Sequence, residues 1–316
     1  MAEGSQRAPR SAGSSDLLVP FRWFDALCIN QPDADEKGKQ VNMMRDIYRQ
    51  AHRVPVWPGE EGEGKKLEPL IKFAWKLATV NTSTLPADRV ARQKSLGFED
   101  SHVLSLSCML QRLWFRRIWV VQEVAVAIEA ILYCGQKSLT WEMMCSISDL
   151  ESGVNMIRVN NQMVMDIIEG IEFEKNAANQ STPMTLLHVL LRHRTSLSTD
   201  PRDKVYALLS LCTDDILQAN YRLPTREMHR LLTQIYLRQH CNLDIITVPS
   251  NPIFLPPNIG PSWIPDWNVT DVAFPLALRA QLVFETDYQA TGHSKWTPKV
   301  SEEGNMLGVE AQFIDE

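Results

Sequence analysis

The stretch between residues 112 and 119 holds the densest group of side chains that could bind a ligand. Basic and aromatic residues alternate in it: Arg112, Trp114, Phe115, Arg116, Arg117 and Trp119. Guanidinium groups interleaved with aromatic rings can stack on a nucleobase or bind phosphate. In the alternative interpretation, the rings pack inward and the arginines pair with nearby acids. Because the stretch is short and the chain is acidic, the sequence favours this structural interpretation.

The motifs that mark common catalytic sites are absent from the sequence. It contains no P-loop, no glycine-rich dinucleotide-binding turn, no nucleophile elbow and no zinc-protease motif. The glycine-rich stretch 59–64 carries three glutamates, which would repel phosphate. His188 and His193 would lie about 140° apart around a helix, too far to share a metal ion. Cys28 and Cys134 lie in apolar runs and are expected to be small buried residues. We therefore expect no bound metal and no cofactor.

The composition is typical of a globular protein. The chain has 316 residues, of which 44% are hydrophobic and 22% charged, enough for one large or two smaller units with a real core. Its 38 acidic and 32 basic residues give a net charge of −6, which offers no general attraction to nucleic acid. No signal peptide and no run of 18 apolar residues is present, so the sequence predicts a cytoplasmic chain that does not span a membrane.

The first 140 residues alternate between predicted strands and helices. Residues 1–21 are polar and are expected to be a disordered lead-in. The pattern then predicts a buried strand over 21–29, a helix over 34–52, a strand over 54–57, a helix over 67–78, a loop over 81–100, a helix over 101–113 and a strand over 130–134. Because parallel strands need helical crossovers, this alternation predicts an α/β unit with a small, mainly parallel sheet flanked by helices.

From residue 141 the pattern becomes mostly helical. Asp200 followed by Pro201 is a strong helix start. The predicted elements are helices over 141–150, 160–173, 184–194, 201–211 and 226–240, and strands over 243–248 and 308–314. Residues 141–316 are therefore expected to form a mainly helical extension.

The apolar positions of the first unit predict its core. The side chains expected to be largely buried are Trp23, Leu27, Ile29, Val41, Met44, Ile47, Trp57, Trp119 and Val121.

Several separate blocks of the sequence occur in the order found in one fungal family. They are WFDALCINQ at 23–31, the helical pattern that ends at Ala51, Val56-Trp57, and WFRRIWVVQE at 114–123. In these blocks the chain resembles the fungal heterokaryon incompatibility (HET) domain, over residues 22–140. The segments DPRDKVYALLSL at 200–211 and PSWIPDW at 261–267 are similar to stretches that commonly follow this domain. The opening strand of the family is not recognised in residues 1–22, so the resemblance implies a domain that lacks its first strand.

The resemblance also implies a function. HET proteins are implicated in vegetative incompatibility, in which fusion of genetically different fungal cells triggers programmed cell death. A member would act in self/non-self recognition and death signalling by protein interaction. Its expected partners are other incompatibility proteins or further copies of itself, rather than nucleic acid or a membrane.

A more distant resemblance implies an enzyme. HET domains are thought to be related to the Toll/interleukin-1 receptor (TIR) fold, and Trp119 to Glu123 is similar to the Trp-x-x-x-Glu segment of its NAD-cleaving members. By this resemblance Glu123 is the catalytic carboxylate, Asp25, Asn30 and Trp119 bind the substrate, and NAD is a substrate rather than a bound cofactor. In the alternative, Glu123 is a helix residue paired with an arginine of the preceding block.

Overall fold

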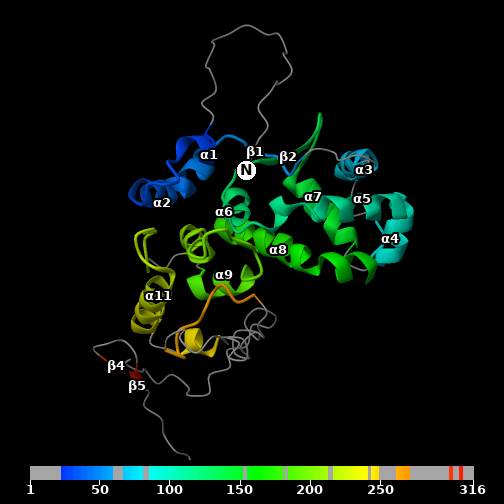
Figure 1. The fold of residues 1–316 in the computed structure, drawn as a ribbon. Coiled ribbons are helices and arrows are strands. Elements are labelled where there is room, and N and C mark those ends of the chain that lie inside the picture. The colour runs from blue at the N-terminus through cyan, green and yellow to red at the C-terminus, as the bar shows by residue number, and fades with distance from the viewer. Residues whose placement is uncertain are drawn as a thin grey trace, which may run out of the picture.

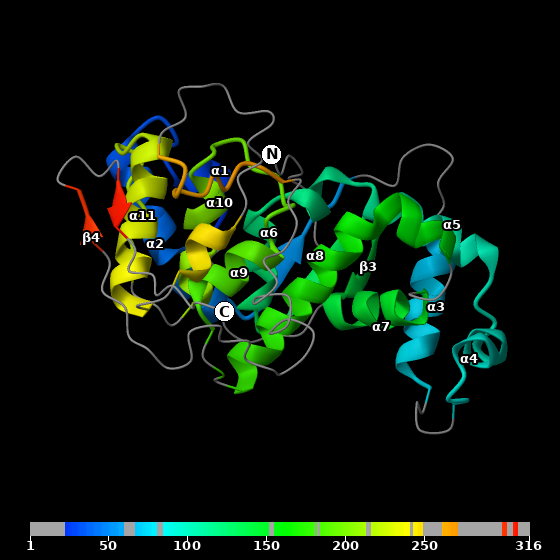
Figure 2. The same cartoon turned by 90° about the horizontal axis from the view of Figure 1, so that it is seen from below.

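The computed structural model is shown from two sides (Figure 1, Figure 2). It describes residues 23–59, 67–80, 85–151, 155–180, 182, 184–212, 216–240, 243–248, 261–270, 299–301 and 306–308. The predicted lead-in over 1–21 lies outside these residues, as does the predicted last strand beyond Gly308.

A three-stranded sheet lies in the first half of the chain. Its strands, in the order β1-β2-β3, are β1 (Val54–Val56), β2 (Ala130–Cys134) and β3 (Lys137–Thr140). β1 pairs with β2 in parallel, and β2 pairs with β3 antiparallel through a turn at Gly135, whose φ of 63° suits glycine. The α/β prediction is confirmed, but the sheet is mixed rather than mainly parallel. Pro55, which has no N–H to donate, lies on an edge strand as expected.

The segment predicted as a buried first strand is a short helix, α1 (Asp25–Cys28). The N–H groups of Leu27 and Cys28 donate to the carbonyl of Phe24 at 3.0 and 2.8 Å, so the backbone bonds locally instead of joining the sheet. Leu27 is 83% exposed and Cys28 is exposed, which contradicts their predicted burial. A run this short fits either a strand or a helix, and its apolar content alone does not distinguish them.

The helix α2 (Ala34–Gln50) confirms the prediction for this segment. Asp33 caps it, because its Oδ1 accepts from the N–H groups of Asp35 at 2.9 Å and Glu36 at 3.1 Å. The buried side of α2 is formed by Gly38, Val41 and Met44.

Further helices connect β1 to β2. They are α3 (Glu68–Ala78), α4 (Arg89–Leu96), α5 (Asp100–Leu110), the 3₁₀ helix η2 (Leu113–Arg116) and α6 (Trp119–Ala125). The predicted loop over 81–100 was wrong for α4. The carboxylate of Asp88 caps that helix by accepting from the N–H of Ala91 at 2.8 Å, and Gly97 ends it with a φ of 71°. Its sequence is mostly polar, so it lacks the apolar spacing that predicts a helix.

The second half of the chain is mainly helical, as predicted, with different boundaries. Its elements are α7 (Trp141–Glu151), α8 (Asn155–Gln180), α9 (Leu186–Arg192), α10 (Asp203–Tyr206), η3 (Leu209–Leu211), α11 (Thr225–His240), η4 (Asp244–Thr247), β4 (Lys299–Val300) and β5 (Leu307–Gly308). The predicted helix over 201–211 is two short helices, and the predicted strand over 243–248 is a 3₁₀ helix.

The helix α8 runs through the middle of the molecule (Figure 2). It packs on α5, α6, α7, α9 and η2. The helices α3, α4 and α5 lie at one end, whereas α2 and α11 lie at the other (Figure 2).

The predicted core is confirmed only in part. Ile29, Val41, Met44 and Val121 are buried, whereas Trp23, Ile47, Trp57 and Trp119 are half-buried and Leu27 is exposed. The large fully buried aromatic side chains are instead Phe115, Trp141 and Trp267.

Candidate functional site

Glu123 lies inside the molecule, on the short helix α6. Its side chain is 8% exposed, and every residue from Val120 to Ala125 is buried with it. Burial raises the pKa of the Glu123 carboxyl to about 7. The charge of Arg117 and a hydrogen bond with the side chain of Trp114 oppose this shift, whereas the negative charge of Asp25 adds to it. Within the described part of the chain, Glu123 has no ion pair within 4.0 Å.

Tyr48 on α2 belongs to the same group of side chains. Burial raises its pKa well above the ordinary tyrosine value, and the charges of Glu123 and Asp25 raise it further. Its ring meets the ring of Trp23 edge-on, with centroids 5.7 Å apart. We call Asp25, Tyr48, Arg117 and Glu123 the Glu123 cluster. Asp25 comes from α1, Tyr48 from α2 and Glu123 from α6, and Arg117 directly follows η2.

The Glu123 cluster is suited to proton chemistry. A carboxyl group with a pKa near 7 is present in both protonation states at neutral pH, so it can act as a general acid or base. A nearby carboxylate and a buried phenol are polar groups that could orient a ligand or take part in a proton-linked change of packing.

The structure shows an interaction between two of the four residues that the sequence proposed for a site. Glu123 and Asp25 are close enough for their charges to interact. Asn30 is exposed, and its backbone N–H donates to Oε1 of Glu36 at 3.1 Å, at the start of α2. Trp119 is half-buried, and its indole N–H donates to Oδ2 of Asp203 at 3.1 Å. The roles proposed for these residues stay predictions.

Asp203 and its partners form a second buried polar group, which sequence reasoning missed. The hydroxyl of Tyr221 donates to Oδ1 of Asp203 at 2.5 Å. Burial raises the pKa of Asp203 above the ordinary aspartate value, although the bonds from Tyr221 and Trp119 favour the charged form. Lys37 on α2 places its ammonium 3.9 Å from the centre of the Tyr221 ring and 3.7 Å from Oδ2 of Asp200.

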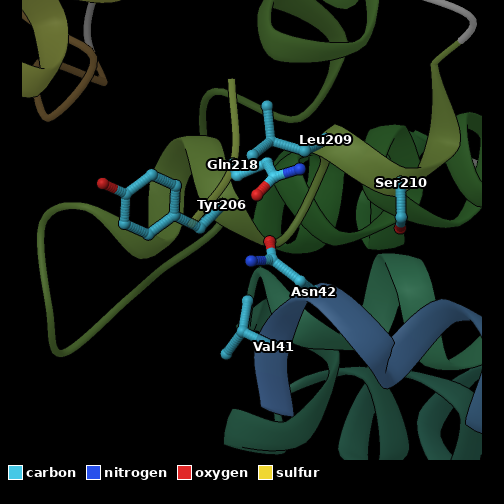
Figure 3. Close-up of a pocket in the computed structure, with 6 residues that line it drawn as sticks. All are labelled: Val41, Asn42, Tyr206, Leu209, Ser210 and Gln218. Atoms are coloured by element: carbon cyan, nitrogen blue, oxygen red, sulfur yellow. The ribbon is translucent and has the colours of Figure 1, made fainter. Parts of the chain in front are cut away.

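A small pocket lies where α2 meets the segment after α10 (Figure 3). Its volume is about 210 Å³, and its lining is Val41, Asn42, Tyr206, Leu209, Ser210 and Gln218. Typical ligand pockets are larger, at about 300–1,000 Å³, and the lining carries no charged side chain. The pocket is separate from Glu123, and we assign no ligand to it.

The described residues carry no group of three or more His, Cys, Asp and Glu side chains arranged to hold a metal ion. Among the described helices, none combines the length and the apolar character needed to cross a membrane.

Comparison with known proteins identifies the first part of the chain. Residues 12–123 match the family described as heterokaryon incompatibility protein (HET), and Glu123 is the last residue of the match. The chain contains a heterokaryon incompatibility domain. Within the described residues, this HET domain includes α1 to α5, β1, η2 and most of α6, and therefore the whole Glu123 cluster.

The similarity to one relative extends beyond the HET domain. The chain is 24% identical to heterokaryon incompatibility protein 6, OR allele, of Neurospora crassa over 312 residues. The alignment covers 78% of this chain and 44% of that protein, so the chain spans less than half the length of this relative. No solved structure matches, and the TIR-like fold stays a prediction.

Proposed function

We propose that this chain is a self/non-self recognition and programmed-cell-death signalling module of vegetative incompatibility, which acts in the cytoplasm by protein interaction and assembly. The HET domain and the Neurospora relative support the incompatibility role. Other incompatibility proteins or further copies of the chain are its partners.

One geometric observation supports an interaction role. The block WFDALCIN, which carries much of the likeness to the HET family, forms α1 and turns apolar side chains outward. Leu27 is 83% exposed and Phe24 is 42% exposed, and Cys28 between Leu27 and Ile29 is also exposed. Neighbouring apolar side chains on a surface are typical of a protein interaction site.

The test is expression of the full chain in a filamentous fungus, with two differently tagged copies. We expect the parent chain to inhibit growth and the two copies to co-purify. Leu27→Asp should abolish both effects, because it places a charge on the apolar face of α1. Leu104→Asp is the matched control, since Leu104 is 67% exposed on α5, and it should behave like the parent chain. Growth inhibition of equal strength by a folded Leu27→Asp chain would contradict the proposal.

A second candidate function is NAD hydrolysis, and the Glu123 cluster favours it. In this reaction water forms a new bond to C1′ of the ribose, and the glycosidic C–N bond breaks. The bonding electron pair leaves with nicotinamide, and one proton is released. Nicotinamide leaves as a neutral molecule, so no general acid is needed, and a carboxylate can stabilise the oxocarbenium-like transition state. Glu123 would supply that carboxylate, with Asp25 nearby to bind ribose hydroxyls.

This second function is tested by nicotinamide release from NAD with the purified full chain. Glu123→Gln should abolish release, whereas Glu227→Gln on α11, remote in sequence and paired with Arg230, should not. Because the reactive form is the carboxylate and its pKa is about 7, the rate should rise with pH through that value. Equal release by the Glu123→Gln chain would exclude Glu123 as the catalytic carboxylate, and no release by the folded parent chain would exclude NAD hydrolysis while leaving the signalling proposal intact.

A further inference from the structure

The helix α6 carries two side chains with partners outside it. Trp119 and Glu123 are four residues apart, so they lie on the same side of the helix, about one turn from each other. Glu123 belongs to the Glu123 cluster, whereas the indole N–H of Trp119 donates to Oδ2 of Asp203 at 3.1 Å. The first turn of α6 is therefore hydrogen-bonded to Asp203, which lies 84 positions further along the chain.

Asp203 is itself held firmly in place. It is 6% exposed, and Tyr221 donates to its other carboxylate oxygen at 2.5 Å. Its backbone N–H donates to the carbonyl of Asp200 at 3.0 Å, and Lys37 of α2 lies between Asp200 and the Tyr221 ring. A side chain fixed from this many directions can position the group that it binds.

The same segment also holds α2, the helix that carries Tyr48 of the Glu123 cluster. The N–H of Ala219 donates to Oδ1 of Asn42 at 2.9 Å, and Arg222 forms an ion pair with Asp35. Asp203, Ala219 and Arg222 therefore contact the two helices that bring Tyr48 and Glu123 together, and α2 packs directly on α6.

We propose that Asp203 is a positioning residue for the HET domain: through Trp119 it fixes the rotation of α6 and thereby the placement of Glu123 beside Asp25 and Tyr48. This inference holds whether or not the chain cleaves NAD. It gives the block DPRDKVYALLSL a function, because the charged residues of that block are used inside the protein. Asp203 holds α6, and Lys204, 6% exposed, donates to the carbonyls of Arg194, at 2.9 Å, and Ser196.

The test uses indole N–H signals in ¹⁵N–¹H NMR spectra of the full chain. The side chain of Trp114 interacts with Glu123, so its signal should titrate with a midpoint near pH 7 and lose this titration in the Glu123→Gln chain. Trp119→Phe removes the bond to Asp203. We expect it to lower the midpoint by at least about half a unit, because a loosened α6 admits water to Glu123 and relieves the effect of burial.

Tyr206→Phe is the matched control. It removes the bond from the Tyr206 hydroxyl to the carbonyl of Asn220, 2.9 Å long, and leaves in place the aromatic ring and the bonds that Trp119 and Tyr221 donate to Asp203. It should lower Tm about as much as Trp119→Phe and leave the midpoint unchanged. A Trp119→Phe chain with lowered Tm and the parent midpoint would overturn the proposal, as would equal midpoint shifts in the two variants.

A measurement on the parent chain covers the case in which Trp119→Phe does not fold. Coupling between two sites is reciprocal, so the indole signal of Trp119 should itself titrate with the midpoint of Glu123. In the Glu123→Gln chain that titration should disappear. A Trp119 signal that stays constant while Glu123 titrates would also overturn the positioning role.

Discussion

Glu123 is a carboxyl group that the fold keeps protonated well beyond its ordinary range. An unfolded chain ionises a glutamic acid near pH 4.3, whereas burial in α6 raises the pKa of Glu123 to about 7. Between these two values the folded state binds more protons than the unfolded state, so the free energy of unfolding falls as pH rises. The stabilisation is complete below the lower value and is lost above the upper one. The protein therefore retains a residue that weakens it at neutral pH, which is common at functional sites.

Glu123→Gln should remove this pH dependence, because glutamine has nearly the same shape and cannot ionise. The free energy of unfolding of the variant minus that of the parent chain should be about 2–3 kcal/mol larger at pH 8 than at pH 5, because the parent chain loses stability over this range. Urea denaturation at the two pH values measures the difference. The control Glu227→Gln changes a half-buried acid whose partner is the surface residue Arg230, and it should alter stability by less than about 1 kcal/mol. A Glu123→Gln chain that is equally destabilised at both pH values would show that the carboxylate is a structural partner.

At the scale of elements, the contact between α2 and the segment around Ala219 is unusually close. A Cβ atom added to Gly38 would lie 2.8 Å from the carbonyl oxygen of Ala219. The absence of a side chain at Gly38 therefore allows the extension to reach the HET domain.

Gly38→Ala should separate these two elements. In a helix interior this change ordinarily stabilises by about 1 kcal/mol, but here the clash should reverse the sign and cost about 1–3 kcal/mol. The free energy of unfolding in urea checks the sign, and Lys39→Ala, at the exposed neighbouring position, is the control for helix propensity. A stabilised Gly38→Ala chain would mean that the two elements are not in contact in solution.

Elements marked by a helix cap and by regular apolar spacing could be predicted from the sequence, whereas elements that depend on distant partners could not. The cap at Asp33 and the apolar spacing after it are local, so α2 could be predicted. The apolar block that became α1 carries no period that separates a strand from a helix, and its partners are distant in sequence. Glu123 was found by resemblance, whereas Asp203 was missed because its partner Trp119 is 84 residues away and no local pattern links the two.

At the scale of the whole molecule, one apolar core extends through both halves of the chain. Buried residues from Ile29 to Trp267 form a single cluster, and α8 packs on helices of both halves. A continuous core favours cooperative unfolding over separate transitions.

Phe115→Ala should therefore destabilise distant helices as well as its own surroundings. Phe115 is 1% exposed in η2, an element that packs on α8, and its truncation should cost about 3–5 kcal/mol. Hydrogen exchange followed by mass spectrometry should show α6 and α11 losing protection together. Leu113→Ala, at a position 74% exposed in the same turn, should leave both unchanged. Loss of protection confined to the first 140 residues would show that the two halves unfold independently.

The bond between Asn42 and Ala219 also has a consequence for synthesis on the ribosome. The two residues are separated by 177 positions, so at about 5–20 residues per second the growing chain needs roughly 10–35 s to make the second after the first. Throughout that interval the apolar side of α2, with Val41 and Met44, has no cover from the segment that later packs on it. The sheet forms late as well, because among the described residues β1 pairs with a strand that begins at Ala130. A nascent HET domain thus leaves the ribosome well before the segment that bonds to Asn42 has been made, and during that time the apolar residues of α2 are exposed to other chains.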